Sequence, residues 1–337
     1  MEKLNIGIIG YANIAKKYAI KAFQALDKVD KIYIASRDIS KSKSCAEEFG
    51  IEVEDSYDSL INNPDIQAVY IPLPIGLHEE WVIKAVSKGK HILCEKSISD
   101  NFASVKKIVD ACKENGVVLF ENFMCDYHPQ HDVVLKAIAS GKVGDVFTLK
   151  SYFGFPPMDK DGFRYNKELG GGSLNDAGAY TIFIARKILD CEPVSVTCRL
   201  NVDDNIGVDV QGTAFVEFDG KTAFLGFGFN NVYQNNYSIW GSKGTLTVKR
   251  AFSIPPELKP EIEVYTNENF QDKTEQLDAP ACNHFELIFD AFCGVVLEND
   301  DDKRVEVYGK ILNQAKVLEA MRLSAKENRK VNIDEIN

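Results

Sequence analysis

The first third of the chain alternates short apolar runs with polar segments of helical length. The run LNIGIIG (Leu4–Gly10) predicts a strand, and apolar residues recur behind it at helical spacing. Further strands are expected at residues 31–37, 68–72, 91–94 and 117–122. Strands that alternate with helices of about 10 to 15 residues are typical of βαβ units, so this part of the chain is expected to form a parallel sheet.

After about residue 145 the predicted strands become longer and are joined by turns instead of helices. Asp219-Gly220 stands between two alternating runs, which is a strong hairpin signal. Helices are expected at residues 173–189, 283–298 and 303–328. The pattern predicts an α+β domain with a large, mostly antiparallel open sheet and helices on one face.

Length and charge set limits on what the chain can be. A chain of 337 residues with 45% hydrophobic content usually forms two domains, and we expect them at 1–122 and 123–337. The formal net charge of -11 speaks against nucleic acid as a partner, because phosphates bind to a basic face. No apolar run approaches the ~20 residues that cross a bilayer, so no membrane association is expected. The N-terminus carries no apolar signal core.

The cysteines and histidines point to a cytoplasmic protein without a metal centre. Eight cysteines occur without a CxxC pair, which is typical of reduced cysteines in the cytoplasm. Five histidines occur without HxH or HExxH spacing, so no metal site is predicted.

The turn after the first strand resembles a dinucleotide-binding turn. In that fingerprint, three glycines allow the turn, the approach of the pyrophosphate and close helix packing. Here Gly10 keeps the first place, while Ala12 and Ala15 take the second and third. Asn13 and Ile14 lie at the start of the helix, whose N-terminus attracts a diphosphate. An ordinary strand-turn-helix is the alternative interpretation.

The end of the second strand favours NADP as the cofactor. NAD enzymes normally place a carboxylate there to accept a hydrogen bond from the ribose 2'-hydroxyl. This chain has Ser36 and Arg37, followed by Lys41 one turn later, which suit a 2'-phosphate. Asp38 follows directly, so NAD remains the less favoured alternative.

Two charged residues close the strand at 91–94. Glu95 and Lys96 follow a short apolar run that has no helical period. Because ligands of parallel sheets lie beyond the carboxyl ends of the strands, these charges are expected to face a crevice rather than a core.

Seven segments together resemble one known family. GIIGYANIA, ASRD, LPIGLHEEW, KGKHILCEKS, ENFMCDYHPQ, GGGSLNDAGAY and GSKGTL occur in the order found in the Gfo/Idh/MocA oxidoreductases. The resemblance covers nearly the whole chain and is closest to the branch of glucose-fructose oxidoreductase, dihydrodiol and xylose dehydrogenases, and nucleotide-sugar 3-ketoreductases. It implies an N-terminal Rossmann domain and an α/β domain whose open sheet commonly forms a subunit interface.

The resemblance also implies the site residues. The lysine of the E-K-P motif is catalytic, which here is Lys96, and the tyrosine of D-x-G-x-Y is the acid/base, here Tyr180, with Asp176 one helical turn before it. Tyr180 would protonate the oxygen of a ketone while Lys96 stabilises its charge. Further cofactor contacts are expected at Pro72, Leu73, His78 and Glu95, and substrate contacts at Arg164, Tyr165 and His128.

Simpler structural interpretations stay open for several of these residues. Tyr180 suits the core side of an amphipathic helix, and Gly170–Gly172 suits a flexible loop before Ser173, a natural helix N-cap. His128 is as compatible with packing as with ligand contact.

Three positions depart from the family pattern. Ser97 replaces the proline of E-K-P, Ile75 stands where relatives carry asparagine, and Asp126 lies where this branch often carries arginine. Asp126 is expected to repel an anionic substrate.

The leading hypothesis is an NADP-dependent ketoreductase or dehydrogenase of a sugar, with a nucleotide-linked 3-keto sugar as the first guess. The alternatives are a dehydrogenase of a free sugar or cyclic diol, and a non-catalytic NADP-binding sensor. Aromatic residues of the second sheet need covering, so a homodimer or homotetramer is expected through it. These are Phe215, Phe218, Phe224, Phe227 and Phe229.

Overall fold

The computed structural model describes residues 2–159 and 161–337. The described chain forms two compact units, which are treated separately below. Unit 1 contains residues 1–124 and 284–315, and unit 2 contains residues 125–283 and 316–337. The expected domain limits of 1–122 and 123–337 stay a prediction.

Unit 1 is built on the parallel sheet that the alternating pattern predicts. Its six strands are hydrogen-bonded in the order β3-β2-β1-β4-β5-β6. They are β1 (Leu4–Ile9), β2 (Val29–Ala35), β3 (Glu52–Val53), β4 (Ala68–Ile71), β5 (His91–Glu95) and β6 (Leu119–Asn122). The strand order reverses between β1 and β4, and ligands of doubly wound sheets bind at such a switch point.

The helices of unit 1 follow the predicted connections between strands. They are η1 (Ala15–Ala19), α1 (Ile20–Gln24), α2 (Ile39–Phe49), α3 (Tyr57–Asn62), η2 (Ile75–Leu77), α4 (His78–Val86), α5 (Phe102–Glu114) and α8 (His284–Glu298). The last of these comes from the far end of the sequence. The ring of Phe289 stacks on Phe23 with centroids 4.2 Å apart, and Asp290 pairs with Lys28 at 2.8 Å. Helix α8 therefore contributes to the core of unit 1.

Unit 2 contains the predicted open sheet, with nine described strands in the order β14-β13-β12-β11-β7-β10-β9-β8-β15. They are β7 (Val146–Gly154), β8 (Ser195–Asp203), β9 (Val208–Phe218), β10 (Lys221–Gly228), β11 (Gln234–Gly241), β12 (Gly244–Lys249), β13 (Glu261–Glu268), β14 (Gln271–Leu277) and β15 (Val331–Asn332). All neighbouring pairs are antiparallel except β7 with β10. The mixed α/β and α+β architecture expected from the sequence is confirmed.

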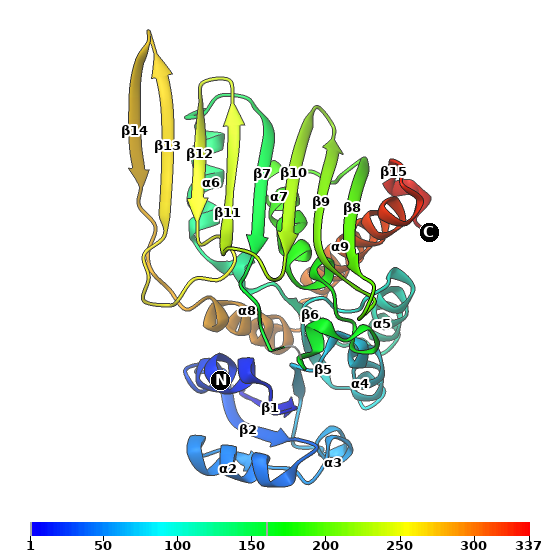
Figure 1. The fold of residues 1–337 in the computed structure, drawn as a ribbon. Coiled ribbons are helices and arrows are strands. Elements are labelled where there is room, and N and C mark those ends of the chain that lie inside the picture. The colour runs from blue at the N-terminus through cyan, green and yellow to red at the C-terminus, as the bar shows by residue number, and fades with distance from the viewer. Residues whose placement is uncertain (1, 160) are drawn as a thin grey trace. The chain divides into compact units, whose positions relative to one another are not determined.

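Helices cover one face of the second sheet. These are α6 (Gln130–Ala139), the π-helix η6 (Leu174–Gly178), α7 (Ala179–Leu189) and the C-terminal part of α9 (Asp301–Glu327), and in Figure 1 they lie behind the strands. Because side chains alternate between faces, only some aromatic residues point outward. The expectation that all five phenylalanines form an exposed face is wrong for Phe218, Phe227 and Phe229, which are buried on the helix side.

The outer face keeps two of the expected phenylalanines and carries further aromatic residues. Phe224 is 45% exposed and lies against Phe215 with centroids 5.1 Å apart, and Trp240 is 54% exposed beside Phe147 at 5.0 Å. Tyr152 and Tyr265 are also exposed. The outer face is therefore aromatic, as expected, through Phe215 and Phe224 together with residues of β7, β11 and β13.

The hairpin of β13 and β14 was not predicted. Its residues are largely polar, and its turn lacks the glycine that marks the other hairpins. Asn269 and Phe270 both have positive φ, at 53° and 61°, which is uncommon for residues other than glycine. The local sequence therefore does not predict this hairpin, whose first strand is formed by pairing with β12.

The described residues contain neither a membrane-spanning helix nor a cluster of metal ligands. No helix among residues 2–159 and 161–337 is sufficiently long and apolar to cross a membrane. Within the same residues, no group of three or more His, Cys, Asp or Glu side chains could hold a metal ion.

The carboxyl end of β5 carries a buried acid. Glu95 is 8% exposed, and its Oε1 accepts hydrogen bonds from the hydroxyl of Tyr70 and the amide of Asn122, each at 2.6 Å. Burial raises the pKa of Glu95, while the two donors and the nearby charge of Lys96 lower it by less. An ionised Glu95 therefore reduces the stability of the fold at neutral pH.

We predict that Glu95→Gln raises the thermal unfolding midpoint at pH 8. The amide keeps an oxygen for both donors and removes the buried charge. Because the folded pKa is raised, the gain shrinks as the pH falls towards the ordinary value of 4.5, where the wild-type carboxyl is protonated too. Scanning calorimetry from pH 4 to pH 8 measures this difference.

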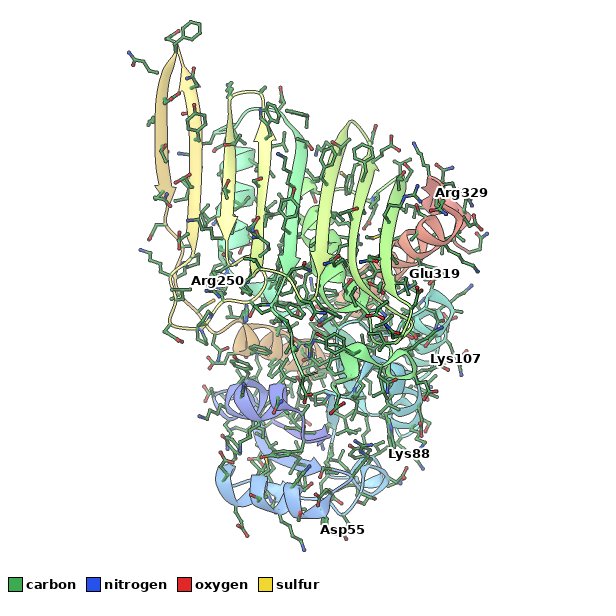
Figure 2. The ribbon with its side chains drawn as sticks, in the orientation of Figure 1. Asp55, Lys88, Lys107, Arg250, Glu319 and Arg329 are labelled. Carbon is green, nitrogen blue, oxygen red and sulfur yellow. The ribbon has the colours of Figure 1, made fainter. Side chains whose placement is uncertain are left out.

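Glu79→Gln is the control, because the pKa of Glu79 is lowered whereas that of Glu95 is raised. Glu79 pairs with Lys107, which Figure 2 labels on α5, and this contact lowers the pKa of Glu79. Its replacement is expected to leave the midpoint unchanged or slightly lower at pH 8. A lower midpoint for Glu95→Gln at pH 8 contradicts the account of Glu95.

Candidate active site

The switch point of the first sheet brings the turns after β1 and β4 together. Gly10 has a φ of 113°, and a Cβ atom there would lie 2.9 Å from Cδ2 of Leu73 and 3.5 Å from the hydroxyl of Tyr57. The first glycine of the predicted nucleotide turn is therefore required by conformation and by space. Ala12 is partly exposed and Asn13 is exposed, so the turn can receive a ligand from solvent.

The helical segment behind this turn is irregular. It begins as the π-helix η1 and continues as α1, without an acidic residue in its first turn. The segment that leads to Tyr180 also begins with a π-helix, η6. Short π-helical stretches are rare and occur frequently at functional sites. Periodicity does not reveal them, because an inserted residue changes the spacing only locally.

The polar residues after β2 have different roles from one another. The hydroxyl of Ser36 is buried, donates to the carbonyl of Asp38 at 2.5 Å and accepts from Ser42 at 2.9 Å. Asp38 caps α2 by accepting from the backbone N–H of Ser40 at 3.1 Å. Ser36 thus orders the loop, and the carboxylate of Asp38 is turned towards the helix.

Arg37 and Lys41 are both exposed beside this loop. The hydroxyl of Tyr57 lies near Arg37: burial raises the pKa of Tyr57, and the charge and backbone of Arg37 lower it by less. Tyr57 also stands edge-on to Trp81 at 4.9 Å. Sequence reasoning missed Tyr57, because one tyrosine at the start of a helix has no motif of its own.

Lys96 is partly exposed within a run of buried residues that includes Glu95 and Ser97. The segment is held on both sides, since Glu95 is fixed by its two donors and the backbone N–H of Ile98 donates to the carboxylate of Glu121 at 2.9 Å. The peptide bond from Lys96 to Ser97 is cis. The structure therefore places Lys96 at the carboxyl edge of the sheet, where the sequence predicts it.

His78 and Ile75 lie at the beginning of α4 and are both buried. The Nε2 atom of His78 lies 2.7 Å from the carbonyl oxygen of Leu73, and its Nδ1 atom 3.1 Å from that of Ser97. Ile75, in η2, is 4% exposed and packs in the core, so it presents no polar group there.

Arg164 and Asp176 form the central ion pair of the second group of candidates, in unit 2. The Nε atom of Arg164 donates to Oδ2 of Asp176 at 2.5 Å, where their side chains are 27% and 10% exposed. The guanidinium also lies 4.7 Å from the ring centroid of Phe163. The arginine is therefore fixed in orientation by a carboxylate and a ring, rather than being a solvated surface side chain.

The three glycines before η6 are closely packed. A Cβ atom at Gly171 would lie 2.5 Å from the carbonyl oxygen of Arg164, and one at Gly172, whose φ is 121°, would lie 2.4 Å from Asp209. Interpretation of this segment as a flexible loop is therefore wrong.

Asp209 on β9 fastens the start of η6. Its Oδ2 accepts from the hydroxyl of Ser173 and from the backbone N–H of Leu174, both at 2.7 Å. Ser173 makes no side-chain cap hydrogen bond to the helix, so its expected N-cap role is wrong. Asp209 takes that role from a neighbouring strand, which the local sequence could not indicate.

Tyr180 lies in an aromatic cluster of unit 2 and is 5% exposed. Its ring is edge-on to Phe153 at 5.3 Å and tilted against Phe252 at 5.8 Å. The structure therefore gives Tyr180 the packed surroundings of a core aromatic, and its catalytic role stays a prediction.

The remaining substrate candidates have defined partners. Tyr165 donates from its hydroxyl to Asn230 at 2.9 Å. His128 is buried and accepts from the backbone N–H of Gln130 at 3.2 Å, and burial lowers its pKa to about 4. Such a neutral, enclosed ring is typical of a structural histidine.

Asp126 is paired with a lysine. Its carboxylate lies 2.5 Å from Nζ of Lys187 on α7, with both side chains about four-fifths buried. The expectation that Asp126 repels an anionic substrate is not supported, because the neighbouring ammonium offsets its charge.

Two family models match the chain. The model of the oxidoreductase family with an NAD-binding Rossmann fold matches residues 4–123, and the model of the GFO/IDH/MocA C-terminal domain matches residues 131–247. Six of the seven segments on which the sequence resemblance rests lie within these two regions, and ENFMCDYHPQ (residues 121–130) lies mostly between them.

Individual proteins resemble the chain over most of its length. A dTDP-3,4-didehydro-2,6-dideoxy-alpha-D-glucose 3-reductase of Actinomadura kijaniata is 34% identical, over 96% of this chain and 96% of that protein. A D-xylose 1-dehydrogenase (NADP(+)) 2 of Haloferax volcanii is 34% identical over 77% of this chain and 80% of that one. The crystal structure of a 3-ketoreductase from Actinomadura kijaniata, in complex with NADP and TDP-benzene, has a TM-score of 0.91 at 33% identity and covers 96% of this chain and 98% of its own. With two family models and relatives of this similarity, the chain belongs to the Gfo/Idh/MocA family of oxidoreductases.

Proposed function

We propose that the protein is an NADP-dependent sugar ketoreductase whose substrate is a nucleotide-linked 3-keto sugar. Two residues, each described within its own unit, carry the proposal: a partly exposed lysine at the end of β5 in unit 1 and an arginine fixed by an ion pair in unit 2. Lys96 suits a developing negative charge on a carbonyl oxygen, and Arg164 suits a diphosphate. The 3-ketoreductases among the relatives act on dTDP-linked sugars.

The cofactor is NADP, for reasons that lie in unit 1. The exposed guanidinium of Arg37 and the ammonium of Lys41 flank the loop after β2, where a 2'-phosphate is expected. Asp38 kept NAD as an alternative cofactor, but its carboxylate accepts a hydrogen bond as the N-cap of α2. Gly10, Ala12, Asn13 and Ile14 receive the pyrophosphate, and Pro72, Leu73 and His78 border the nicotinamide end. When bound, the nicotinamide supplies the hydride.

Lys96 and Tyr180 act together on the oxygen of the ketone. The Tyr180 hydroxyl gives a proton to that oxygen, and the Lys96 ammonium stabilises the charge that forms there. In the related 3-ketoreductase, a lysine and a tyrosine have each been substituted for crystallography, and they lie the same number of residues apart as Lys96 and Tyr180.

Asp176 serves this reaction by holding Arg164 rather than by moving a proton. Its carboxylate is engaged with the guanidinium at 2.5 Å, so both groups are pre-organised before substrate binds. Arg164 then contacts the diphosphate, and Tyr165, fixed by Asn230, lies beside it in sequence. The Asp126–Lys187 pair removes the objection to an anionic substrate.

We predict that Lys96→Ala abolishes NADPH-dependent reduction of a dTDP-linked 3-keto sugar. Tyr180→Phe is expected to lower kcat by about 10² to 10⁴, the usual contribution of a positioned general acid. NADPH oxidation, followed by absorbance, measures both, and Lys43→Ala on the exposed surface of α2 is the control. Equal turnover of free sugars or diols contradicts the nucleotide-linked substrate, and NADPH binding without turnover of any carbonyl contradicts the enzyme.

Cofactor choice has its own test. Arg37→Ala is expected to raise the KM for NADPH roughly tenfold, because charge-assisted hydrogen bonds contribute about 1.5 to 3 kcal/mol. The KM for NADH is expected to stay within about twofold, since NADH has no 2'-phosphate. Steady-state kinetics with both cofactors measure the ratio, and a similar rise for both cofactors contradicts the role of Arg37.

The protein is further proposed to be a cytoplasmic homodimer or homotetramer that associates through the outer face of the second sheet. Phe224 and Trp240 give this face exposed aromatic area, which monomeric proteins normally avoid. Six of the eight cysteines are buried, as suits reduced cysteines in a reducing compartment.

We predict that the double variant Phe224→Glu and Trp240→Glu is monomeric in sedimentation experiments, because four carboxylates would face one another across a twofold interface. Val305→Glu, which alters an apolar residue that is 65% exposed on α9, is expected to leave the assembly unchanged. A wild-type protein that sediments as a monomer at micromolar concentration contradicts the proposed interface.

A further inference from the structure

His78 joins two turns of unit 1 that belong to neighbouring strands. Strands β4 and β5 are paired up to Ile71 and Cys94, and the chain leaves both at the same edge of the sheet. The imidazole of His78 is fully buried there. Its Nε2 faces the carbonyl oxygen of Leu73 at 2.7 Å, and its Nδ1 faces the carbonyl oxygen of Ser97 at 3.1 Å.

Both partners of the ring are acceptors. A carbonyl oxygen cannot donate, so each contact is a hydrogen bond only when the facing nitrogen carries a proton. Burial lowers the pKa of His78, and the carbonyls of Leu73, Ser97 and Ile98 oppose that effect. A neutral ring carries one proton and donates to one of the two carbonyls at a time, so the tautomer decides which turn the ring ties, and only the doubly protonated ring donates to both.

Ser97 is the residue that directly follows Lys96. On the N-terminal side, Glu95 is fixed by Tyr70 and Asn122. On the C-terminal side, Ile98 is fixed by Glu121. The contact from His78 falls between these two anchors, on the carbonyl group that follows the lysine. Serine at position 97 restricts the backbone angle φ less than proline would. A contact at the Ser97 carbonyl can therefore restrict a backbone that proline would already have fixed.

We propose that His78 is a positioning residue that fixes the Ser97 carbonyl through Nδ1 and thereby the orientation of Lys96. In the tautomer that carries its proton on Nε2, the ring instead donates to the Leu73 carbonyl and holds that turn. The inference rests on the proposed function, because it concerns the lysine to which that function assigns the stabilisation of charge.

Two amide substitutions separate the two nitrogens. Asparagine brings its amide nitrogen close to the position of Nδ1, and glutamine brings its own close to that of Nε2. His78→Asn therefore keeps a donor for Ser97, and His78→Gln keeps a donor for Leu73. His78→Leu keeps neither and fills the same space.

The expected outcome is a split between kcat and KM. His78→Gln lowers kcat by roughly tenfold to a hundredfold, since a displacement of about 1 Å in a catalytic group costs up to 10². His78→Asn keeps kcat within about threefold of the wild type and raises the KM for NADPH instead. Equal losses of kcat in the two variants overturn the inference, and an unchanged kcat in folded His78→Gln does so if the Ser97 carbonyl and the Lys96 ammonium also stay in place.

His91→Leu is the matched control, at the other end of the same strand. The Nδ1 atom of His91 accepts from the backbone N–H of Val118 at 3.0 Å, so this variant also removes a ring-to-backbone contact from β5. It is expected to lower the thermal unfolding midpoint while kcat stays at the wild-type value. A fall in kcat for His91→Leu equal to that of His78→Gln would indicate general loosening of β5 and overturn the inference.

Crystal structures of the His78 variants with NADP separate this inference from the proposed function. The Ser97 carbonyl and the Lys96 ammonium are expected to move in His78→Gln and to stay in place in His78→Asn. Unmoved atoms in His78→Gln overturn the role of His78, whatever the turnover. Moved atoms support that role even if turnover is unaffected, and in that case the catalytic assignment of Lys96 is the statement that fails.

Discussion

The fixed backbone at the end of β5 is the constraint on which the account of this protein depends. A lysine side chain has four rotatable bonds, and it can serve a reaction only if its backbone is held. Here the hold comes from polar contacts in a nearly water-free setting, where Glu95 accepts from two neighbouring strands and Ile98 is bound by Glu121. The fold tolerates a buried acid whose ionisation costs stability, and what it gains is a defined position for the next residue.

A similar arrangement recurs in unit 2. Asp209 reaches from a strand to the first turn of a helix, and Asp176 on that helix reaches back to Arg164. The glycine segment makes both contacts possible, because any side chain at Gly171 or Gly172 would occupy the space of the neighbouring chain. In unit 2 a carboxylate fixes a cation directly, and in unit 1 a carboxylate fixes the backbone next to one.

The sequence predicts the architecture because periodicity and turn chemistry are local signals. The strands of the first sheet, the Asp219-Gly220 hairpin and both closing helices follow from patterns of a few residues. The hairpin of β13 and β14 does not, since its strands are polar and its turn lacks glycine. Which phenylalanines face outward also escaped prediction, because one residue of register decides the face.

For the candidate site, the sequence indicates residue types but not their partners. Lys96 and Gly10 could be placed because they stand at strand ends, whereas Asp209 and Tyr57 come from elements far away in the chain. Asp126 is an example. The sequence alone suggests that its carboxylate repels an anionic substrate, whereas the ion pair with Lys187 offsets that charge. Ser36 is a second example. Its position suggests a contact with a 2'-phosphate, whereas its hydrogen bonds with Asp38 and Ser42 order the loop.

The most direct test of the central claim is a crystal structure of the protein with NADP and an unreactive dTDP-sugar analogue. The account predicts that the Lys96 ammonium and the Tyr180 hydroxyl both lie within about 3 Å of the same oxygen on the sugar. It also predicts that the diphosphate contacts Arg164. A complex in which either group points away from that oxygen, with the ligand bound and ordered, contradicts it.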